Sequence, residues 1–226
     1  MTVGKAILAL TILGFVAGCD RHEPTGPAEE QNNGGVGNQA LLVRADVDVD
    51  PRTGGFLTEF VVDVLDGDNQ PVSGADVTIE WNYSPIQLTE SGAPGTYVAD
   101  FAGAGSGPLK LRVEKDGMYV RDVVLGNIGI HAIIEPEPHD TVPANEPLQV
   151  RWVSDTEAQS ARLSTHGDTF DVLDQGEFVI PANLNPARDD QYIEIERYNE
   201  VQLSGGLPGS YFRMEVETRV EPVVVL

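Results

Sequence analysis

QPVSGADVTIEW, residues 70–81, is the stretch of sequence that decides the fold. It opens with proline, serine and glycine, which are residues that form tight turns. The rest alternates polar with apolar side chains, in the order Asp76, Val77, Thr78, Ile79, Glu80 and Trp81. Because successive side chains of a strand point to opposite faces, this alternation predicts a strand with one buried and one solvated face.

The same alternation recurs on both sides of this stretch, in DVDVD at 46–50 and in LKLRVE at 109–114. Further candidate strands lie between residues 147 and 220, in PLQVRWV, SARLS, EFVIPA, QYIEIERYN and SYFRMEVETRV. Segments rich in glycine, proline and aspartate separate them, and no helical period is sustained beyond the first 20 residues. The chain is therefore predicted to be all-β, with its sheets packed as sandwiches.

One part of the chain resembles a known family. QPVSGADVTIEW, followed by LTESGAPGTYVADF and LKLRVEKDGM, is similar to the immunoglobulin-like modules of bacterial surface proteins and to the related carboxypeptidase-regulatory-like domains. The shared positions are Pro71, Val72, Gly74, Ala75 and Val77, and then Gly95, Thr96 and Tyr97. The resemblance implies an immunoglobulin-like β-sandwich over residues 41–127, and it specifies fold better than activity.

A second β-sandwich is expected at residues 148–226, with its first strand beginning near residue 130. The segment 128–147 holds a connecting strand and then four prolines, which remove ladder donors and predict a domain junction. PLQVRW weakly resembles the opening of fibronectin type III-like sandwiches, with Trp152 as the core aromatic residue. We therefore expect two tandem sandwiches, and one larger β-domain is the alternative.

The first 18 residues are typical of an export signal, and the only cysteine follows them. Lys5 precedes an apolar run at 6–17 that is too short to span a bilayer as a helix. Val16-Ala17-Gly18-Cys19 resembles the lipobox of bacterial lipoproteins. The resemblance implies cleavage before Cys19 and acylation of its sulfur, so that the lipid bilayer is a partner. A secreted protein with an unmodified cysteine is the alternative.

Residues 19–40 have almost no apolar side chains, and they are rich in glycine, proline, glutamate and asparagine. Such a segment cannot bury enough surface to offset its conformational entropy. We therefore expect a flexible, lipidated tether that holds the folded part in the cell envelope, on the periplasmic or cell-surface side of a membrane.

The chain is strongly acidic, with 14 basic against 36 acidic residues and a net charge of −22. This charge repels nucleic acids and anionic lipid surfaces, so neither is expected as a partner of the folded part. Asp46, Asp48 and Asp50 share one face of a predicted strand, and they are expected to lie on a solvated face.

The sequence offers few candidate ligands for a metal ion. His131, His139 and Asp140 lie close together at the predicted junction, but a zinc site needs three or four converging ligands, and a solvated junction is the simpler interpretation. The acidic turn at 66–69 could bring Asp66, Asp68 and Asn69 together around a calcium ion, but it lacks the glycine and terminal glutamate of an EF-hand loop. We predict no metal and no cofactor.

No catalytic motif is recognisable. GAGSG at 103–107 lacks the offsets of a Gly-x-Ser-x-Gly elbow, and no phosphate loop or dinucleotide fingerprint occurs. We expect a non-catalytic envelope protein that displays its sandwiches for protein binding, glycan binding or assembly, through turns at 66–69, 92–95 and 103–107. An envelope hydrolase or accessory enzyme with a shallow site is the alternative.

Overall fold

The computed structural model describes residues 34–226, and it contains strands, turns and one short 3-10 helix, η1 (Ala182–Leu184). The all-β prediction is therefore confirmed. The predicted signal peptide and Cys19 lie outside the described residues. Among the residues that are described, no helix has the length and apolar character needed to cross a membrane.

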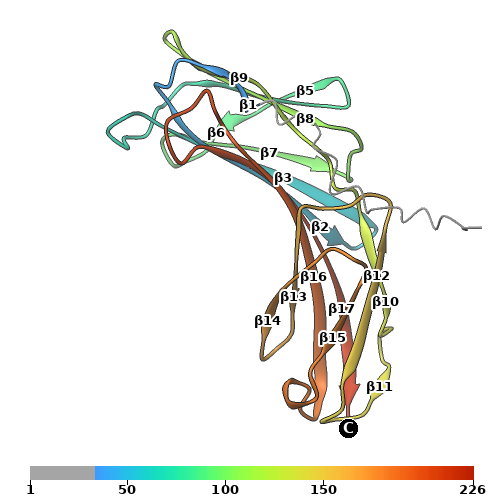
Figure 1. Ribbon diagram of the computed structural model, residues 1–226. Helices are drawn as coiled ribbons and strands as arrows, with labels where there is room; N and C mark the ends of the chain where they lie inside the picture. Colours follow the sequence, from blue (N-terminus) through green and yellow to red (C-terminus); the bar gives the residue numbers. More distant parts are fainter. Residues whose placement is uncertain (1–33) are drawn as a thin grey trace, which may run out of the picture.

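Two elongated lobes meet at an angle (Figure 1). The N-terminal lobe is built from β1 (Gly34–Gly37), β2 (Leu42–Arg52), β3 (Gly55–Leu65), β4 (Asp76–Trp81), β5 (Ser84–Gln87), β6 (Thr89–Glu90), β7 (Thr96–Ala102), β8 (Leu109–Lys115) and β9 (Met118–Leu125). The C-terminal lobe is built from β10 (His131–Glu135), β11 (Thr141–Val142), β12 (Leu148–Ser154), β13 (Ser160–Ser164), β14 (Thr169–Val172), β15 (Glu177–Ile180), β16 (Arg188–Gln202) and β17 (Tyr211–Val225).

The strands predicted at 46–50, 76–81 and 109–114 are confirmed as parts of β2, β4 and β8. Each buries its apolar side chains on one face. In β2 the inner side chains are those of Val43, Ala45, Val47 and Val49, and the polar side chains between them face outward. The hydrophobic effect therefore fixes which face of each strand packs on the core.

Three sheets form the two sandwiches. The five-stranded sheet has the order β1-β9-β8-β4-β5, and the three-stranded sheet has the order β10-β12-β15. The nine-stranded sheet has the order β14-β13-β16-β17-β2-β3-β7-β6, with β11 beside β17. This third sheet is continuous through both lobes because β17 pairs in parallel with β2 (Figure 1).

The long hairpin of β16 and β17 supplies side chains to both cores. Near its tip, Leu203, Phe212 and Met214 pack in the core of the N-terminal lobe. Toward its other end, Ile193 and Val223 pack in the core of the C-terminal lobe. The segment predicted as a second sandwich, 148–226, therefore also completes the first one, which strand periodicity cannot reveal because it does not specify pairing partners.

A buried ion pair lies between the two cores. Arg197 is 0% exposed, and its Nε and Nη2 atoms donate to the carboxylate of Asp174 at 2.9 and 2.6 Å. Trp152 Nε1 donates to the same carboxylate at 3.0 Å, and the Ala158 N–H donates to it at 2.7 Å. Arg197 Nη1 also donates to the Ile128 carbonyl at 3.2 Å. We call these five residues the Arg197 node.

The described chain begins in a strand. Gly34–Gly37 forms β1 and pairs with β9, and the Gln39 N–H donates to the Gly205 carbonyl at 3.1 Å. A Cβ atom on Gly37 would overlap this same carbonyl, so the close approach requires glycine. This corrects the C-terminal end of the tether predicted at 19–40, because residues 34–37 belong to the fold. Residues 19–33 lie outside the described part.

Candidate functional site

The structure does not bring the candidate metal ligands together. His131 is buried, and its Nε2 donates to the Ile195 carbonyl at 2.9 Å, whereas His139 and Asp140 lie in an exposed turn. Burial, together with the positive charge of Arg197, lowers the pKa of His131 to about 4. Within residues 34–226 no group of three histidine, cysteine or acidic side chains is placed to hold a metal ion.

The turns proposed for display make their own hydrogen bonds. Asp66 Oδ1 accepts from the N–H groups of Asp68 and Gln70 at 2.8 and 2.9 Å, which closes the turn at 66–69. Glu90 accepts from the Gly95 N–H at 2.9 Å, and this donor is the largest of those that lower the pKa of Glu90. The turn at 103–107 packs on Trp81, whose ring lies against Gly105.

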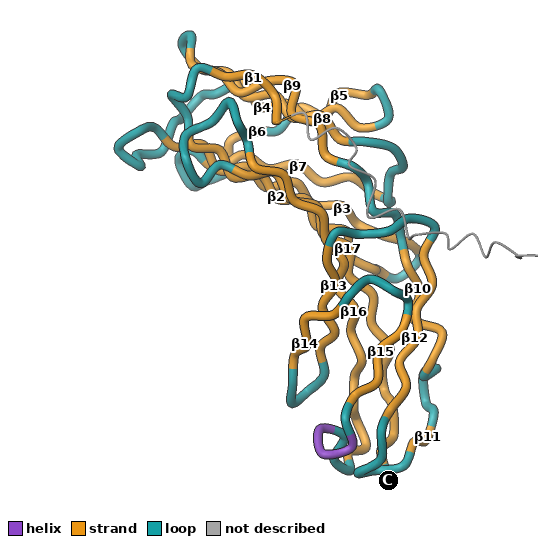
Figure 2. Tube along the Cα trace, viewed as in Figure 1, coloured by secondary structure: helices purple, strands orange, loops and turns teal. Residues whose placement is uncertain are grey.

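Figure 2 shows that these turns lie at the ends of the strands, away from the sheet faces. The polar side chains of the molecule gather instead on two sheet faces. One is the outer face of the nine-stranded sheet, and the other is the outer face of the five-stranded sheet.

We call the first surface the acidic face, formed by the outward side chains of β2, β16 and β17. Asp48 pairs across strands with Glu215, and Glu196 pairs with Glu217. Arg213 reaches both Glu196 and Glu215, at 3.0 and 2.5 Å. Carboxylates therefore crowd one another here, and they outnumber the arginines of the same face, Arg44, Arg213 and Arg219.

This crowding changes the titration of the acidic face. Burial, aided by the charge of Glu196, raises the pKa of Glu215 to about 7. Burial, aided by Glu194, raises the pKa of Glu217 to about 7 as well. Burial also raises the pKa of Asp48 to about 6. Asp46, Asp48 and Asp50 lie on the outward face of β2, as expected, and they are half-buried there because the side chains of β17 stand beside them.

We call the second surface the mixed-charge face, on strands β4, β8 and β9. It carries both lysines of the described chain, Lys110 and Lys115, together with Arg112 and Arg121. Carboxylates alternate with these cations: Asp76, Glu80, Glu114, Asp116 and Asp122. A chain with so large an acidic excess thus concentrates four cations on one face.

A β-bulge builds the centre of the mixed-charge face. The pairs Leu111–Val123 and Val113–Val120 leave two residues of β9, Arg121 and Asp122, opposite one residue of β8. Asp122 adopts a φ of 56°, which lets the strand accommodate the extra residue. Lys110 then contacts Asp122 at 2.7 Å, and Arg121 forms an ion pair with Glu114. Sequence alternation could not show this, because the bulge breaks the period.

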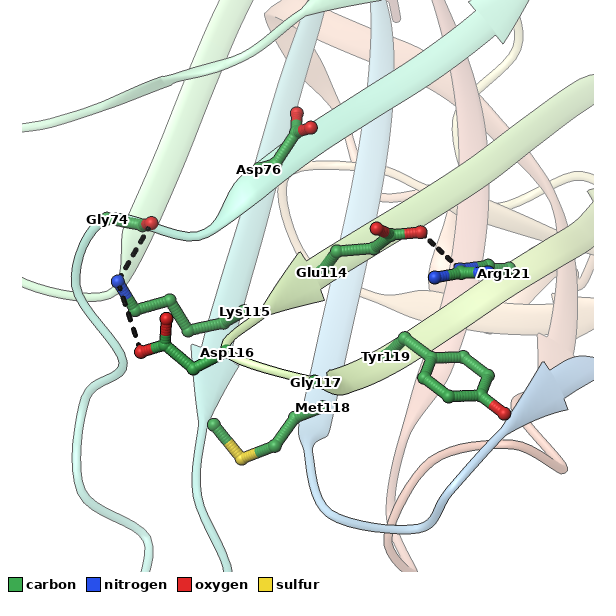
Figure 3. Close-up of a pocket in the computed structure, with 9 residues that line it drawn as sticks. All are labelled: Gly74, Asp76, Glu114, Lys115, Asp116, Gly117, Met118, Tyr119 and Arg121. Carbon is green, nitrogen blue, oxygen red and sulfur yellow. Dashed lines mark hydrogen bonds and ion pairs between the residues drawn. The ribbon is translucent and has the colours of Figure 1, made fainter.

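A hollow of about 340 Å³ lies at the end of this face, and Figure 3 shows the residues that line it. Lys115 Nζ donates to the Gly74 carbonyl at 3.2 Å, and it lies 3.6 Å from Asp116. The guanidinium of Arg121 stacks over the ring of Tyr119 at 4.5 Å. A second hollow, of about 420 Å³, shares Asp76 and Arg121 with the first. Together they form a shallow polar trough.

The trough is suited to binding through ion pairs and hydrogen bonds. Its cations are half-exposed, and their carboxylate partners lie at the surface, so that a partner's acidic groups can exchange for them. Its lining is made mainly of charged side chains, with Tyr119 and Thr78 as further hydrogen-bonding groups.

Comparisons with solved structures return fibronectin(III)-like modules and an adhesin among their matches. Fibronectin(III)-like modules of CbhA from Clostridium thermocellum are 16% identical, with 78% of this chain and 92% of that chain covered and a TM-score of 0.26. The adhesin InvE of Yersinia pseudotuberculosis is 12% identical, with 79% and 60% covered and a TM-score of 0.29. No protein-family model matches the sequence, and no curated protein matches it.

Proposed function

We propose that this is a non-catalytic, lipid-anchored protein of the cell envelope, and that its mixed-charge face binds a protein or a glycan that carries acidic groups. The observation that supports this best is the gathering of Lys110, Arg112, Lys115 and Arg121 on one face of a chain with a net charge of −22. An acidic partner is repelled least where these cations lie.

The acidic face differs from the mixed-charge face because most of its outward side chains are carboxylates. Its outward side chains include Asp46, Asp48, Glu194, Glu196, Glu200, Glu215 and Glu217. An acidic partner that approaches this face meets mainly like charges, which cost free energy and slow association. The two faces therefore give the molecule a preferred side for an acidic partner.

The proposed anchor is compatible with this orientation. Strand β1 is the edge strand of the sheet that carries the mixed-charge face, and residues 19–33, the part of the predicted tether at 19–40 that precedes β1, lead into it. A flexible segment of this length reaches roughly 20 Å, from about 5 to 6 Å times the square root of the residue number. The binding face would then stay close to other components of the envelope.

The experiment is a brief crosslink in the native cells, followed by capture of the tagged protein. We expect the variant with Arg112→Glu and Arg121→Glu to lose its partner, whereas Arg151→Glu with Arg188→Glu, exposed arginines of the C-terminal lobe, retains it. Capture by wild type should also weaken as salt rises. Equal capture by both double variants contradicts the choice of face.

The anchor has a separate test. Wild-type protein grown with a labelled fatty acid should carry the label, and Cys19→Ala should not. An unlabelled wild-type protein contradicts the lipid anchor. Release of a product from envelope polymers by the purified protein would instead favour the alternative function, an envelope hydrolase.

A further inference from the structure

A hollow of about 450 Å³ lies where the two lobes meet. One wall is the loop 104–108 of the N-terminal lobe, and another is the loop 155–156 of the C-terminal lobe. The connecting segment 127–130 forms the floor between them. Its volume is within the range of small-molecule sites, about 300 to 1,000 Å³, and such sites favour domain interfaces.

The walls are held at a fixed spacing by the Arg197 node. Arg197 donates to the carbonyl of Ile128 in the floor and to the carbonyl of Thr156 in one wall. The Thr156 hydroxyl donates to the Ile128 carbonyl as well. A fully buried guanidinium thus ties the floor to the C-terminal lobe, so little ordering remains to be done when a ligand enters.

The opposite wall is tied to the same floor. Asn127 Nδ2 donates to the Gly105 carbonyl at 2.9 Å, and Asn127 Oδ1 accepts from the Gly129 N–H at 2.7 Å. The ring of Trp81 packs against Gly105, where a Cβ atom would overlap it, and Trp81 Nε1 donates to the Gly107 carbonyl at 3.2 Å. The buried Trp81 side chain therefore fixes the conformation of loop 104–108 on the side that faces away from the hollow.

The hollow offers unused hydrogen-bonding groups. Among the described residues, none accepts from the backbone N–H groups of 104–107, and none pairs with the Ser106 hydroxyl or with the carboxylate of Asp155. Pro108 and Ile130, the latter 39% exposed, add apolar surface. No lysine, arginine or histidine lines the hollow.

We propose that this hollow between the lobes binds a neutral sugar unit. Sugar hydroxyls both donate and accept, so they can use the free N–H groups and the carboxylate of Asp155 together. The C–H surface of a sugar ring can rest on Pro108 and Ile130. Anionic sugars are disfavoured because Asp155 has no compensating cation in the lining. This site is separate from the mixed-charge face.

The test is a titration of isotope-labelled protein, followed by backbone amide chemical shifts. The probes are glucose, galactose, mannose and N-acetylglucosamine, with glucuronate as the anionic comparison. We expect at least one neutral sugar to shift the amides of 105–107, Gly129 and Thr156 in a saturable way. No saturable shift with any of the four sugars at high millimolar concentration overturns the proposal, as does glucuronate binding as tightly as its neutral parent.

Two variants assign the contacts. Asp155→Asn should weaken sugar binding by about tenfold, because the neutral amide oxygen is a weaker acceptor than the carboxylate. Ser106→Ala should weaken it less. Asp189→Asn, an exposed carboxylate of β16 in the C-terminal lobe, is the matched control and should leave affinity unchanged. Unchanged affinity in Asp155→Asn overturns the assignment to this hollow. All three residues are exposed, so the fold should be retained.

Discussion

At the scale of single residues, Arg197 has the most demanding environment. A guanidinium that is 0% exposed needs a partner for its charge and for its donors, and Asp174 with two backbone carbonyls provides them. Removing one member of a buried pair leaves the other charge uncompensated in a poorly solvated place. The same residue sits between two hydrophobic cores, so its loss affects both.

The first prediction concerns this pair. Arg197→Met and Asp174→Asn should each lower the free energy of unfolding by about 3 to 5 kcal/mol, because each leaves a buried polar group without its partner. Urea denaturation of each variant measures this. Arg162→Met is the control, since Arg162 contacts Glu196 at the surface at 3.2 Å, and it should cost about 0 to 1 kcal/mol. Similar losses in all three variants would contradict a special role for Arg197.

The second prediction concerns pH. Glu215 and Glu217 have their pKa raised from an ordinary 4.5 to about 7, so in this window the folded state keeps protons that the unfolded state has released. The free energy of unfolding should therefore fall as pH rises from 4.5 to about 7. His131, with its pKa lowered from 6.5 to about 4, acts in the opposite direction between those values.

A variant isolates the acidic contribution. Glu217→Gln should reduce the loss of stability on raising the pH through this window, measured by urea denaturation at a series of pH values. Glu90→Gln is a control of opposite sign, because backbone donors lower the pKa of Glu90 and its stabilisation is lost as the pH falls. An unchanged pH profile in Glu217→Gln would show that this carboxyl titrates alike in the folded and unfolded states.

At the scale of elements, the hairpin of β16 and β17 organises the fold. The side chains of Phe212 and Met214 near its tip complete the core of the N-terminal lobe. The Val43 N–H also donates to the Ser210 hydroxyl at 3.0 Å. Strand β2 would otherwise be the edge of its sheet, with unpaired backbone groups. The N-terminal lobe is therefore complete only when the C-terminal end of the chain is in place.

The third prediction tests this dependence. Phe212→Ala should lower the free energy of unfolding by about 3 to 5 kcal/mol, as expected for a large buried side chain, and it should speed amide exchange in β2. Hydrogen exchange measured by mass spectrometry reports both the free energy of unfolding and the exchange rate of the amides in β2. Phe178→Ala, a half-buried site in the C-terminal lobe, should leave exchange in β2 slow. Equal exchange in β2 for the two variants would argue against the hairpin's role.

Individual strands could be predicted from the sequence, but their partners could not. The alternation around Val77 and Ile79 specifies which side chains are buried, because burial has the period of the strand. Nothing in that period indicates that Arg213 pairs with Asp46, 167 residues away, or that Asp122 belongs to a bulge. The acidic and mixed-charge faces both arise from such pairings, so neither was visible in the sequence.

At the scale of the whole molecule, the two lobes share one sheet and are joined by the Arg197 node. The sequence predicts two tandem sandwiches joined at a junction, and two such separate domains would be able to unfold independently. The shared sheet implies a single cooperative unit, because loss of the hairpin removes core residues from both lobes at once.

The fourth prediction is a single thermal transition. Scanning calorimetry should give a calorimetric enthalpy equal to the van't Hoff enthalpy, as for a two-state unit. The fluorescence of Trp81, in the N-terminal lobe, and of Trp152, in the C-terminal lobe, can be separated with Trp→Phe variants and should change at the same temperature. Two resolved transitions would mean that the lobes unfold independently.

The parallel pairing of β2 with β17 also determines how the molecule bears tension. The chain enters β2 at one end of their shared ladder and leaves β17 at the opposite end, so a pull on the two sides of the described chain slides the strands along each other. Sliding strains the six paired positions together, whereas β1, with three paired positions, can peel from β9 one pair at a time. When the molecule is stretched, β1 should detach from β9 first and lengthen the chain slightly, and the pairing of β2 with β17 should resist further extension.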